Sequence, residues 1–294
     1  MTFSGGKLAR AGMIVFLLCG LPVQDIRAQE LVASPIPSEK EVVTFIAPHQ
    51  PHYNLVGDFY APGDSTRPTL ILLHMLGRDR TTWAPLITEA RQRGYGILAM
   101  DLRGHGASMK TDDGQVIPYS KFDKQGPANE WNSMVDDVSE TVKFLEEKKK
   151  IAPEKIGLVG ASIGANVALN YFVGDSRLWG VLALSPGLNY RDVETLSAMD
   201  RVSMRPVLLV ATKGDSYSFE SCQTLKARAE KANAVEGKKA GVGFLALQGD
   251  EHGTNLLSPT VVSRLLSWIE ETTRTGESSN SKDKATSPTG AKGN

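Results

Sequence analysis

The segment around residue 162 constrains the fold of this 294-residue chain more than any other. Gly160–Gly164 reads G-x-S-x-G, follows the apolar run Lys155–Val159 and precedes Ala165–Phe172, whose apolar spacing predicts a helix. A buried strand, a sharp turn and a helix in this order hold a serine hydroxyl above a sheet on a strained backbone. The flanking glycines lack a Cβ, which lets strand and helix approach closely. The pentapeptide alone can arise by chance, so its context carries the inference.

Apolar, β-rich runs recur along the chain and alternate with helical patterns. The first two runs carry polar residues, as antiparallel edge strands do, and the later ones are nearly continuous, as strands buried on both faces are. Alternation of strand and helix predicts an α/β fold with an eight-stranded, mostly parallel sheet flanked by helices. The predicted strands are Glu41–Ala47, Tyr53–Tyr60, Thr69–Leu73, Gly96–Met100, Lys155–Val159, Gly180–Leu184, Pro206–Ala211 and Gly241–Leu247.

Composition excludes several classes of partner. The chain is 41% hydrophobic and 22% charged, which is enough for one large core, and its formal net charge is zero. Without a dense basic block, we expect neither a nucleic-acid partner nor an anionic membrane surface. The sequence has no histidine or cysteine cluster with metal-ligand spacing and no glycine-rich dinucleotide fingerprint, so we expect no metal and no cofactor.

The N-terminus has the features of a secretory signal peptide. Lys7 and Arg10 precede a short apolar stretch, and cleavage is expected after Ala28, which predicts a secreted or periplasmic protein with no integral membrane segment after cleavage. Cys19 raises a lipoprotein signal as a weaker alternative, because the leucine before it is too large. We divide the chain into a signal peptide (1–28), an extended leader (29–40), one folded domain (41–275) and a disordered tail (276–294).

A serine hydroxyl needs a base to take its proton, and that base needs an orienting partner. On sheets of this kind the three groups follow the order serine, acid, histidine along the chain. His252, in the loop after the last predicted strand, is the only histidine beyond Ser162, which makes it the expected base. The non-catalytic alternative is that His252 is a solvent-exposed histidine in a loop.

The expected acid is Asp215, which follows the predicted strand Pro206–Ala211. The non-catalytic alternative is that Asp215 stabilises a turn or caps the helix that follows. Asp250 is a rival acid in the same loop as the histidine, and Asp192 and Glu194 are lesser rivals.

The tetrahedral intermediate of acyl transfer needs two backbone N–H donors. One is expected from Ile163, the residue after the nucleophile, and the other from the loop after Leu70–Leu73. His74 at the start of that loop is expected to be structural.

Together these residues resemble the α/β-hydrolase family, in particular its small esterase and dienelactone-hydrolase-like branch. The resemblance spans roughly Glu41–Thr272 and is specific in four places, which are His74–Gly77, Asp101–Ser108, Gly160–Gly164 and Glu251–Gly253. It implies the α/β-hydrolase fold and makes Leu76 the second N–H donor. Family members usually carry His-Gly where this chain has His74-Met75, which suggests a narrower entrance. His105 is expected to order its turn.

The leading functional hypothesis is a serine hydrolase that cleaves a small carboxylic ester or thioester through an acyl-enzyme intermediate. A peptidase or amidase of the same fold ranks second, because Ser185–Arg205 is too short for a large cap that could place acidic residues against a substrate amine. A non-catalytic binding protein that retains the fold ranks third, since fold alone does not fix function. A small-molecule acyl substrate is the expected partner. Activity should rise with pH as the catalytic histidine loses its proton.

Leu102–Asn129 is a long polar connection, and loops of this length are often functional. Its segment Lys110–Lys124 is too polar for the apolar lid of a lipase. Tyr119, Phe122 and Trp131 could line an acyl pocket, although core packing is an equal expectation for Trp131. Cys222 shares a helical face with apolar residues and is expected to be buried.

Overall fold

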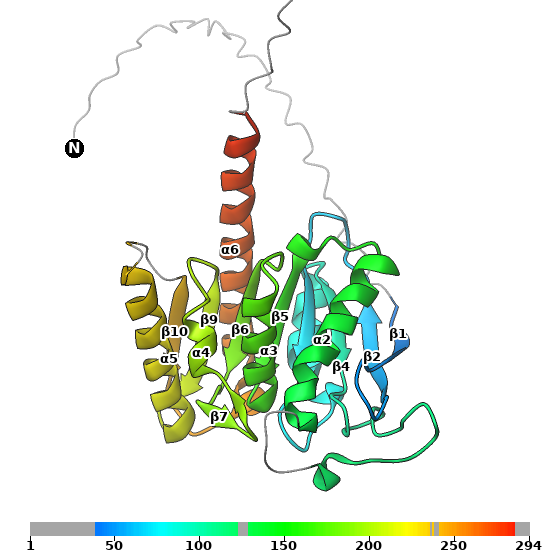
Figure 1. Cartoon of the computed structure of the whole chain (residues 1–294). Coiled ribbons are helices and arrows are strands. Elements are labelled where there is room, and N and C mark those ends of the chain that lie inside the picture. The colour runs from blue at the N-terminus through cyan, green and yellow to red at the C-terminus, as the bar shows by residue number, and fades with distance from the viewer. Residues whose placement is uncertain (1–38, 123–128, 236, 238–240, 286–294) are drawn as a thin grey trace, which may run out of the picture. The chain divides into compact units, whose positions relative to one another are not determined.

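A computed structural model describes residues 39–122, 129–235, 237 and 241–285 of the protein. Its centre is a sheet of eight strands, covered by helices on both faces (Figure 1). The predicted signal peptide and most of the predicted leader lie outside the described residues. None of the helices in the described part of the chain combines the length and apolar character needed to cross a bilayer.

The sheet has the order β1-β2-β4-β3-β5-β6-β9-β10. The pairs β1–β2 and β2–β4 are antiparallel and the remaining pairs are parallel. The mostly parallel eight-stranded sheet predicted from the sequence is therefore confirmed. Its strands are β1 (Glu41–Ile46), β2 (Asn54–Tyr60), β3 (Thr69–Leu73), β4 (Gly96–Met100), β5 (Ile156–Ala161), β6 (Gly180–Leu184), β9 (Val207–Thr212) and β10 (Val242–Leu247).

Successive side chains of each central strand enter two different cores. In β3, Ile71 and Leu73 pack into the core on one face, while Leu70 and Leu72 pack into the core on the other. Side chains alternate across a strand with a period of two, so a strand covered on both faces has to be apolar throughout. This is why the central strands carry continuous apolar runs.

The helices form two layers around the sheet. The helices α2, α3, α4 and α5 cover one face, and α1 and α6 cover the other (Figure 1). Asn129 begins α2 by accepting a hydrogen bond from the Asn132 amide, as a side-chain cap should. The helices are α1 (Ala84–Gln92), α2 (Glu130–Glu147), α3 (Ile163–Gly174), α4 (Leu196–Met199), α5 (Ser216–Val235) and α6 (Pro259–Ala285).

Two segments depart from a simple alternation of strand and helix, namely the connection after β6 and the last helix. The segment after β6 forms a short hairpin of β7 (Asn189–Tyr190) and β8 (Val193–Glu194), followed by α4, which is the minimal cap expected from its length. At the other end, α6 continues to Ala285, past the expected boundary of a disordered tail at residue 276. The chain has no proline between Pro259 and Pro288, so nothing interrupts the helix there. Residues 286–294 lie outside the described residues.

Candidate active site

Ser162 lies at the junction of β5 and α3, at the carboxyl end of the parallel strands. Its backbone has φ 54° and ψ −120°, a conformation that a residue with a Cβ rarely adopts. Close approach of the flanking segments requires glycine on both sides. A Cβ on Gly160 would lie 2.2 Å from the carbonyl oxygen of Gly164, and one on Gly164 would lie 2.2 Å from that of Leu73. The tight turn expected from G-x-S-x-G is present.

His252 and Asp215 are hydrogen bonded across two neighbouring loops. Nδ1 of His252 lies 2.6 Å from Oδ2 of Asp215, and the two side chains are 36% and 14% exposed. A carboxylate can only accept, so Nδ1 carries the proton and Nε2 is left as an acceptor. The rivals Asp250, Asp192 and Glu194 do not make this contact within the described part of the chain.

The loops that carry these two residues are joined by two hydrogen bonds, one between main-chain groups and one from a side chain to the main chain. The amide of Gly214 donates to the carbonyl of Gly249 at 2.8 Å, and the Thr212 hydroxyl donates to the carbonyl of Glu251 at 2.8 Å. Since β9 and β10 are parallel neighbours, their carboxyl ends place the acid and the histidine on the same edge of the sheet.

The side chain of Tyr190 on β7 lies beside His252. The Tyr190 ring stands edge-on to the imidazole, with centroids 6.3 Å apart and an angle of 89° between the planes. Burial raises the pKa of the Tyr190 phenol to about 12, and the hydrogen bond with Ser218 at 3.1 Å acts in the opposite direction. Among the described residues, His252 makes no direct hydrogen bond to Ser162. Such bonds often tighten only when substrate binds.

Two backbone amides are available beside the nucleophile. Ile163 is the first residue of α3 and its N–H has no partner in that helix. Neither the Ile163 nor the Leu76 amide donates a hydrogen bond within the described residues. A Cβ on Gly164 would lie 2.2 Å and 2.6 Å from the carbonyl oxygens of Leu73 and His74, so the loop that carries Leu76 begins close against the start of α3.

Met75 joins that loop to the loop of His252. Its side chain is buried, its sulfur accepts a hydrogen bond from the Thr254 hydroxyl at 3.7 Å, and it leaves no room for a Cβ on Gly253. The Thr82 and Thr254 hydroxyls are 2.6 Å apart and add a second link. Met75 therefore packs between the two loops.

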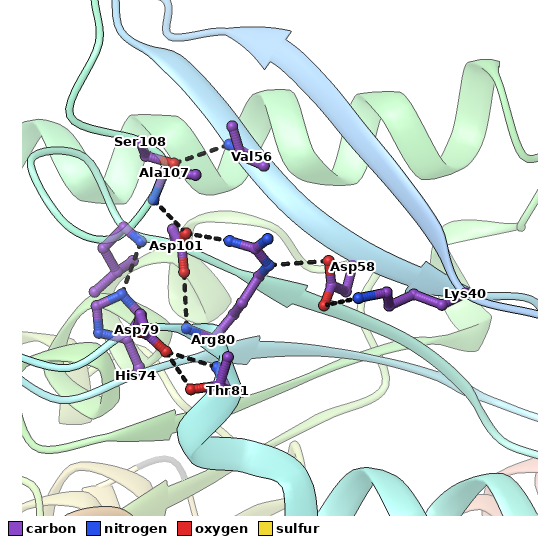
Figure 2. A network of polar contacts seen from close by, with 11 residues as sticks. Lys40, Val56, Asp58, His74, Asp79, Arg80, Thr81, Asp101, Ala107 and Ser108 are labelled. Carbon is purple, nitrogen blue, oxygen red and sulfur yellow. Dashed lines mark hydrogen bonds and ion pairs between the residues drawn. The ribbon is translucent and has the colours of Figure 1, made fainter.

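A buried ion-pair network holds the turn after β4 (Figure 2). Asp101, which is fully buried, accepts hydrogen bonds from the amides of Arg80 and Ala107 at 2.7 Å each, and it pairs with the Arg80 guanidinium. Arg80 also pairs with Asp58 at 2.9 Å. This network fixes the segment that follows Leu76.

His74 and His105 are structural, as expected. Burial lowers the pKa of His74 to about 3, so its ring is neutral. Nδ1 of His74 then donates to the carbonyl of Met75 at 2.9 Å, and Nε2 accepts from the amide of Leu102 at 3.0 Å. His105 stacks on Tyr119 with centroids 4.3 Å apart.

The aromatic residues of the long connection divide between core and site. Phe122 and Trp131 are buried in the core, which favours packing over the lining of a pocket. The Tyr119 hydroxyl lies against Gly77, beside the loop that carries Leu76. Cys222 is fully buried, and burial raises the pKa of its thiol above the ordinary range.

The sequence did not point to three polar residues near the expected triad, namely Tyr190, Ser185 and Ser218. Ser185 has φ 49°, is fully buried, and its hydroxyl accepts a hydrogen bond from the Gly253 amide at 2.9 Å. No motif marks these positions, because their contacts arise only when β6, β7 and α5 pack together.

Comparison with known proteins supports the assignment of the fold. The model of the Hydrolase_4 family, described as serine aminopeptidase, S33, matches residues 64–244, more than half of the chain. Uncharacterized protein YfhR of Salmonella typhimurium is 25% identical over 155 residues, 50% of this chain and 46% of its own. Thiohydrolase aneE of Aspergillus aculeatus is 23% identical over 154 residues, 51% and 44% of the two chains. The matches thus span less than half the length of these curated relatives.

Among solved structures, esterase Pf2001 of Pyrococcus furiosus aligns with a TM-score of 0.59 at 20% identity, over 80% of this chain and 90% of its own. At this identity the likeness concerns the fold. With its sheet order, its turn at Ser162 and the family match, the chain belongs to the Hydrolase_4 family and is an α/β hydrolase with esterase-like neighbours.

Proposed function

We propose that the protein is a serine hydrolase that cleaves a small carboxylic ester or thioester through an acyl-enzyme intermediate. The observation that carries this proposal is the 2.6 Å contact between Asp215 and His252 at the edge of the sheet where the strained turn presents Ser162. The bond to Asp215 places the proton of the neutral imidazole on Nδ1, so Nε2 is the nitrogen that can accept the serine proton. All three side chains come from loops or turns at the carboxyl ends of parallel strands.

In the first half of the reaction, Oγ of Ser162 attacks the acyl carbon while its proton passes to Nε2 of His252. The negative charge that develops on the acyl oxygen would be stabilised by the amides of Ile163 and Leu76, neither of which donates elsewhere within the described residues. His252 then gives its proton to the leaving alcohol or thiol, and the acyl group remains on Ser162. Asp215 stabilises the transient imidazolium.

In the second half, a water molecule gives its proton to His252 and attacks the acyl-enzyme, which releases the carboxylic acid and restores the serine. The minimal cap fits a small substrate, because residues 185–205 contribute only a hairpin and a short helix above the site. One similar protein is named an esterase and another a thiohydrolase, which supports keeping both oxygen esters and thioesters as candidate substrates.

A fluorophosphonate probe tests the nucleophile. We expect the wild-type protein to be labelled covalently, the labelled peptide to contain Ser162, and S162A to remain unlabelled while folded. Hydrolysis of p-nitrophenyl acetate should disappear in the same variant. Labelling of S162A, or a folded wild type that neither reacts with the probe nor turns over activated esters, contradicts the proposal and favours a binding protein.

A peptidase of the same chemistry is the second candidate, because the matched family is described as serine aminopeptidase. Recognition of a substrate amine needs acidic groups near the acyl site. Parallel assays of aminoacyl p-nitroanilides and short-chain p-nitrophenyl esters separate the two. We expect the esters to react faster; preferential cleavage of the anilides would reverse the order.

A further inference from the structure

The carboxyl end of β6 is hydrogen bonded to the main chain at both the expected nucleophile and the expected base. The Ser162 amide donates to the carbonyl of Leu184, the last residue of β6, at 2.8 Å. The hydroxyl of the next residue, Ser185, accepts a hydrogen bond from the Gly253 amide at 2.9 Å. Gly253 directly follows His252. Two adjacent residues thus hold the nucleophile on one side and the base on the other.

Ser185 is itself fixed through its other polar groups. Its amide donates to the carbonyl of Val210 on β9 at 2.7 Å, and its carbonyl accepts a hydrogen bond from the Ser218 hydroxyl at 3.4 Å. The residue is fully buried and has φ 49°, a conformation that a residue with a Cβ rarely adopts. Such a conformation persists only where the surrounding structure determines it. The Ser185 hydroxyl is therefore presented to the histidine loop from a rigid position.

The histidine loop is held by hydroxyl groups on both sides of the base. The side chain of His252 is 36% exposed, so packing restrains it less than it restrains a buried side chain. Before His252, the carbonyl of Glu251 accepts a hydrogen bond from the Thr212 hydroxyl at 2.8 Å. After it, the Gly253 amide donates to Ser185. The main chain on each side of the imidazole is thus attached to the end of a central strand.

We propose that Ser185 is a positioning residue for the base: its hydroxyl holds the main chain after His252 and thereby sets how far the imidazole lies from Ser162. The inference rests on the proposed function and deepens it. A base has to come within about 2.6–3.2 Å of the atom whose proton it takes, so a small displacement of its loop slows the reaction. Ser185 acts only through this placement and exchanges no proton with the substrate.

The first test is S185A, which removes the hydroxyl that binds the Gly253 amide. For p-nitrophenyl acetate we expect kcat to fall about 10- to 100-fold with little change in KM, because misplacing a reacting group by about 1 Å can cost about 100-fold. The second-order rate of fluorophosphonate labelling should fall by a similar factor, since the same base activates the serine in both reactions.

S185G separates the position of the base from the stability of the fold. Glycine also removes the hydroxyl, but it adopts φ 49° without the strain that a Cβ causes. We expect S185G to unfold at a higher urea concentration than S185A and yet to be no faster in ester hydrolysis. If the loss of activity merely followed the loss of stability, S185G would be the faster variant. S185G also carries the test if S185A does not fold.

S108A is the matched control. Ser108 is also fully buried, and its hydroxyl also accepts a hydrogen bond from a main-chain amide, that of Val56 at 2.8 Å (Figure 2). Val56 lies on β2, which β4 and β3 separate from the strand that leads to Ser162. We expect S108A to lose stability, as S185A does, and to keep wild-type kcat.

The inference fails if folded S185A or S185G keeps wild-type kcat, if S185G is faster than S185A, or if S108A loses as much kcat as S185A. Each of these results leaves the serine hydrolase proposal intact. A folded wild type that does not react with the probe at all would overturn both. One set of measurements therefore distinguishes the two failures.

Discussion

Oδ2 of Asp215 lies 2.6 Å from Nδ1 of His252 although 36 residues separate them in the chain. The contact exists because β9 and β10 are parallel neighbours, with Leu247 paired to Thr212 at their carboxyl ends. The loop after each strand therefore starts from the same edge of the sheet. An acid and a base are thus brought together by strand register.

Replacing Asp215 by asparagine should remove the carboxylate charge and supply an amide that can donate as well as accept, so the histidine is no longer held in its reactive tautomer. We expect kcat for an activated ester to fall about 10³- to 10⁴-fold in D215N with little loss of stability. D250N is the matched control, because Asp250 is an exposed carboxylate in the histidine loop. It should retain wild-type activity. A larger loss of activity in D250N than in D215N would show that Asp215 is not the acid that orients His252.

Replacing Gly164 by alanine should damage both stability and activity. The new Cβ would lie 2.2 Å and 2.6 Å from the carbonyl oxygens of Leu73 and His74, so main chain has to move. We expect a loss of about 1–3 kcal/mol in the free energy of unfolding and slower ester hydrolysis, since the loop with Leu76 is displaced. G174A, at the other end of α3 with open space around it, should be neutral or stabilising by up to about 1 kcal/mol. Chemical denaturation of both variants measures the contrast.

Stability should decline as the pH falls because His74 is held neutral. Burial lowers the pKa of His74 to about 3, whereas a histidine in the unfolded chain has a pKa of about 6.5. Above pH 6.5 both states are neutral and the folded state keeps its full stability. Between pH 6.5 and 3 the unfolded state binds a proton that the folded state excludes, so stability is lost in this window.

From pH 6.5 to pH 5 the loss from this one group should be about 2 kcal/mol. Urea unfolding at a series of pH values measures it. H74Q should flatten the dependence. An unchanged slope in H74Q would contradict the assignment.

The ion pair between Asp101 and Arg80 should matter far more than an exposed pair of similar geometry. D101N leaves the Arg80 guanidinium without one of its buried partners, and we expect a loss of about 3–5 kcal/mol in the free energy of unfolding. In the control D200N, the lost pair with Arg228 is exposed to solvent and should cost about 1 kcal/mol or less. Thermal unfolding compares the two, and equal effects would contradict a structural role for the buried network.

The sheet was predictable from sequence because its strands are buried on both faces. Continuous runs such as Thr69–Leu73, Gly96–Met100 and Gly180–Leu184 match the strands residue for residue. The end of α6 was not predicted, because the segment beyond residue 276 has no apolar period in its sequence. Hydrophobic periodicity reports which side chains are buried, so it predicts only those helices and strands that bury a face.

The proposed triad could be predicted because each of its members follows a strand and the order along the chain is fixed by the fold. The residues that surround the triad could not be predicted in this way. Tyr190 lies beside His252 only because the hairpin of residues 189–194 packs against α3, and Met75 reaches Thr254 although the two residues are 179 positions apart in the chain. These contacts depend on packing between distant elements, for which single-residue patterns carry no signal.

The hairpin over the site is held by Asn166 and Asn170 through bonds that reach its main chain. Main-chain carbonyls are present in every residue, so these hydrogen bonds do not require particular side chains in the hairpin. The clamp by Asn166 and Asn170 therefore does not depend on the hairpin's own side chains. The turn inside the hairpin does depend on one of them, because Oδ1 of Asn189 accepts a hydrogen bond from the Asp192 amide at 2.9 Å.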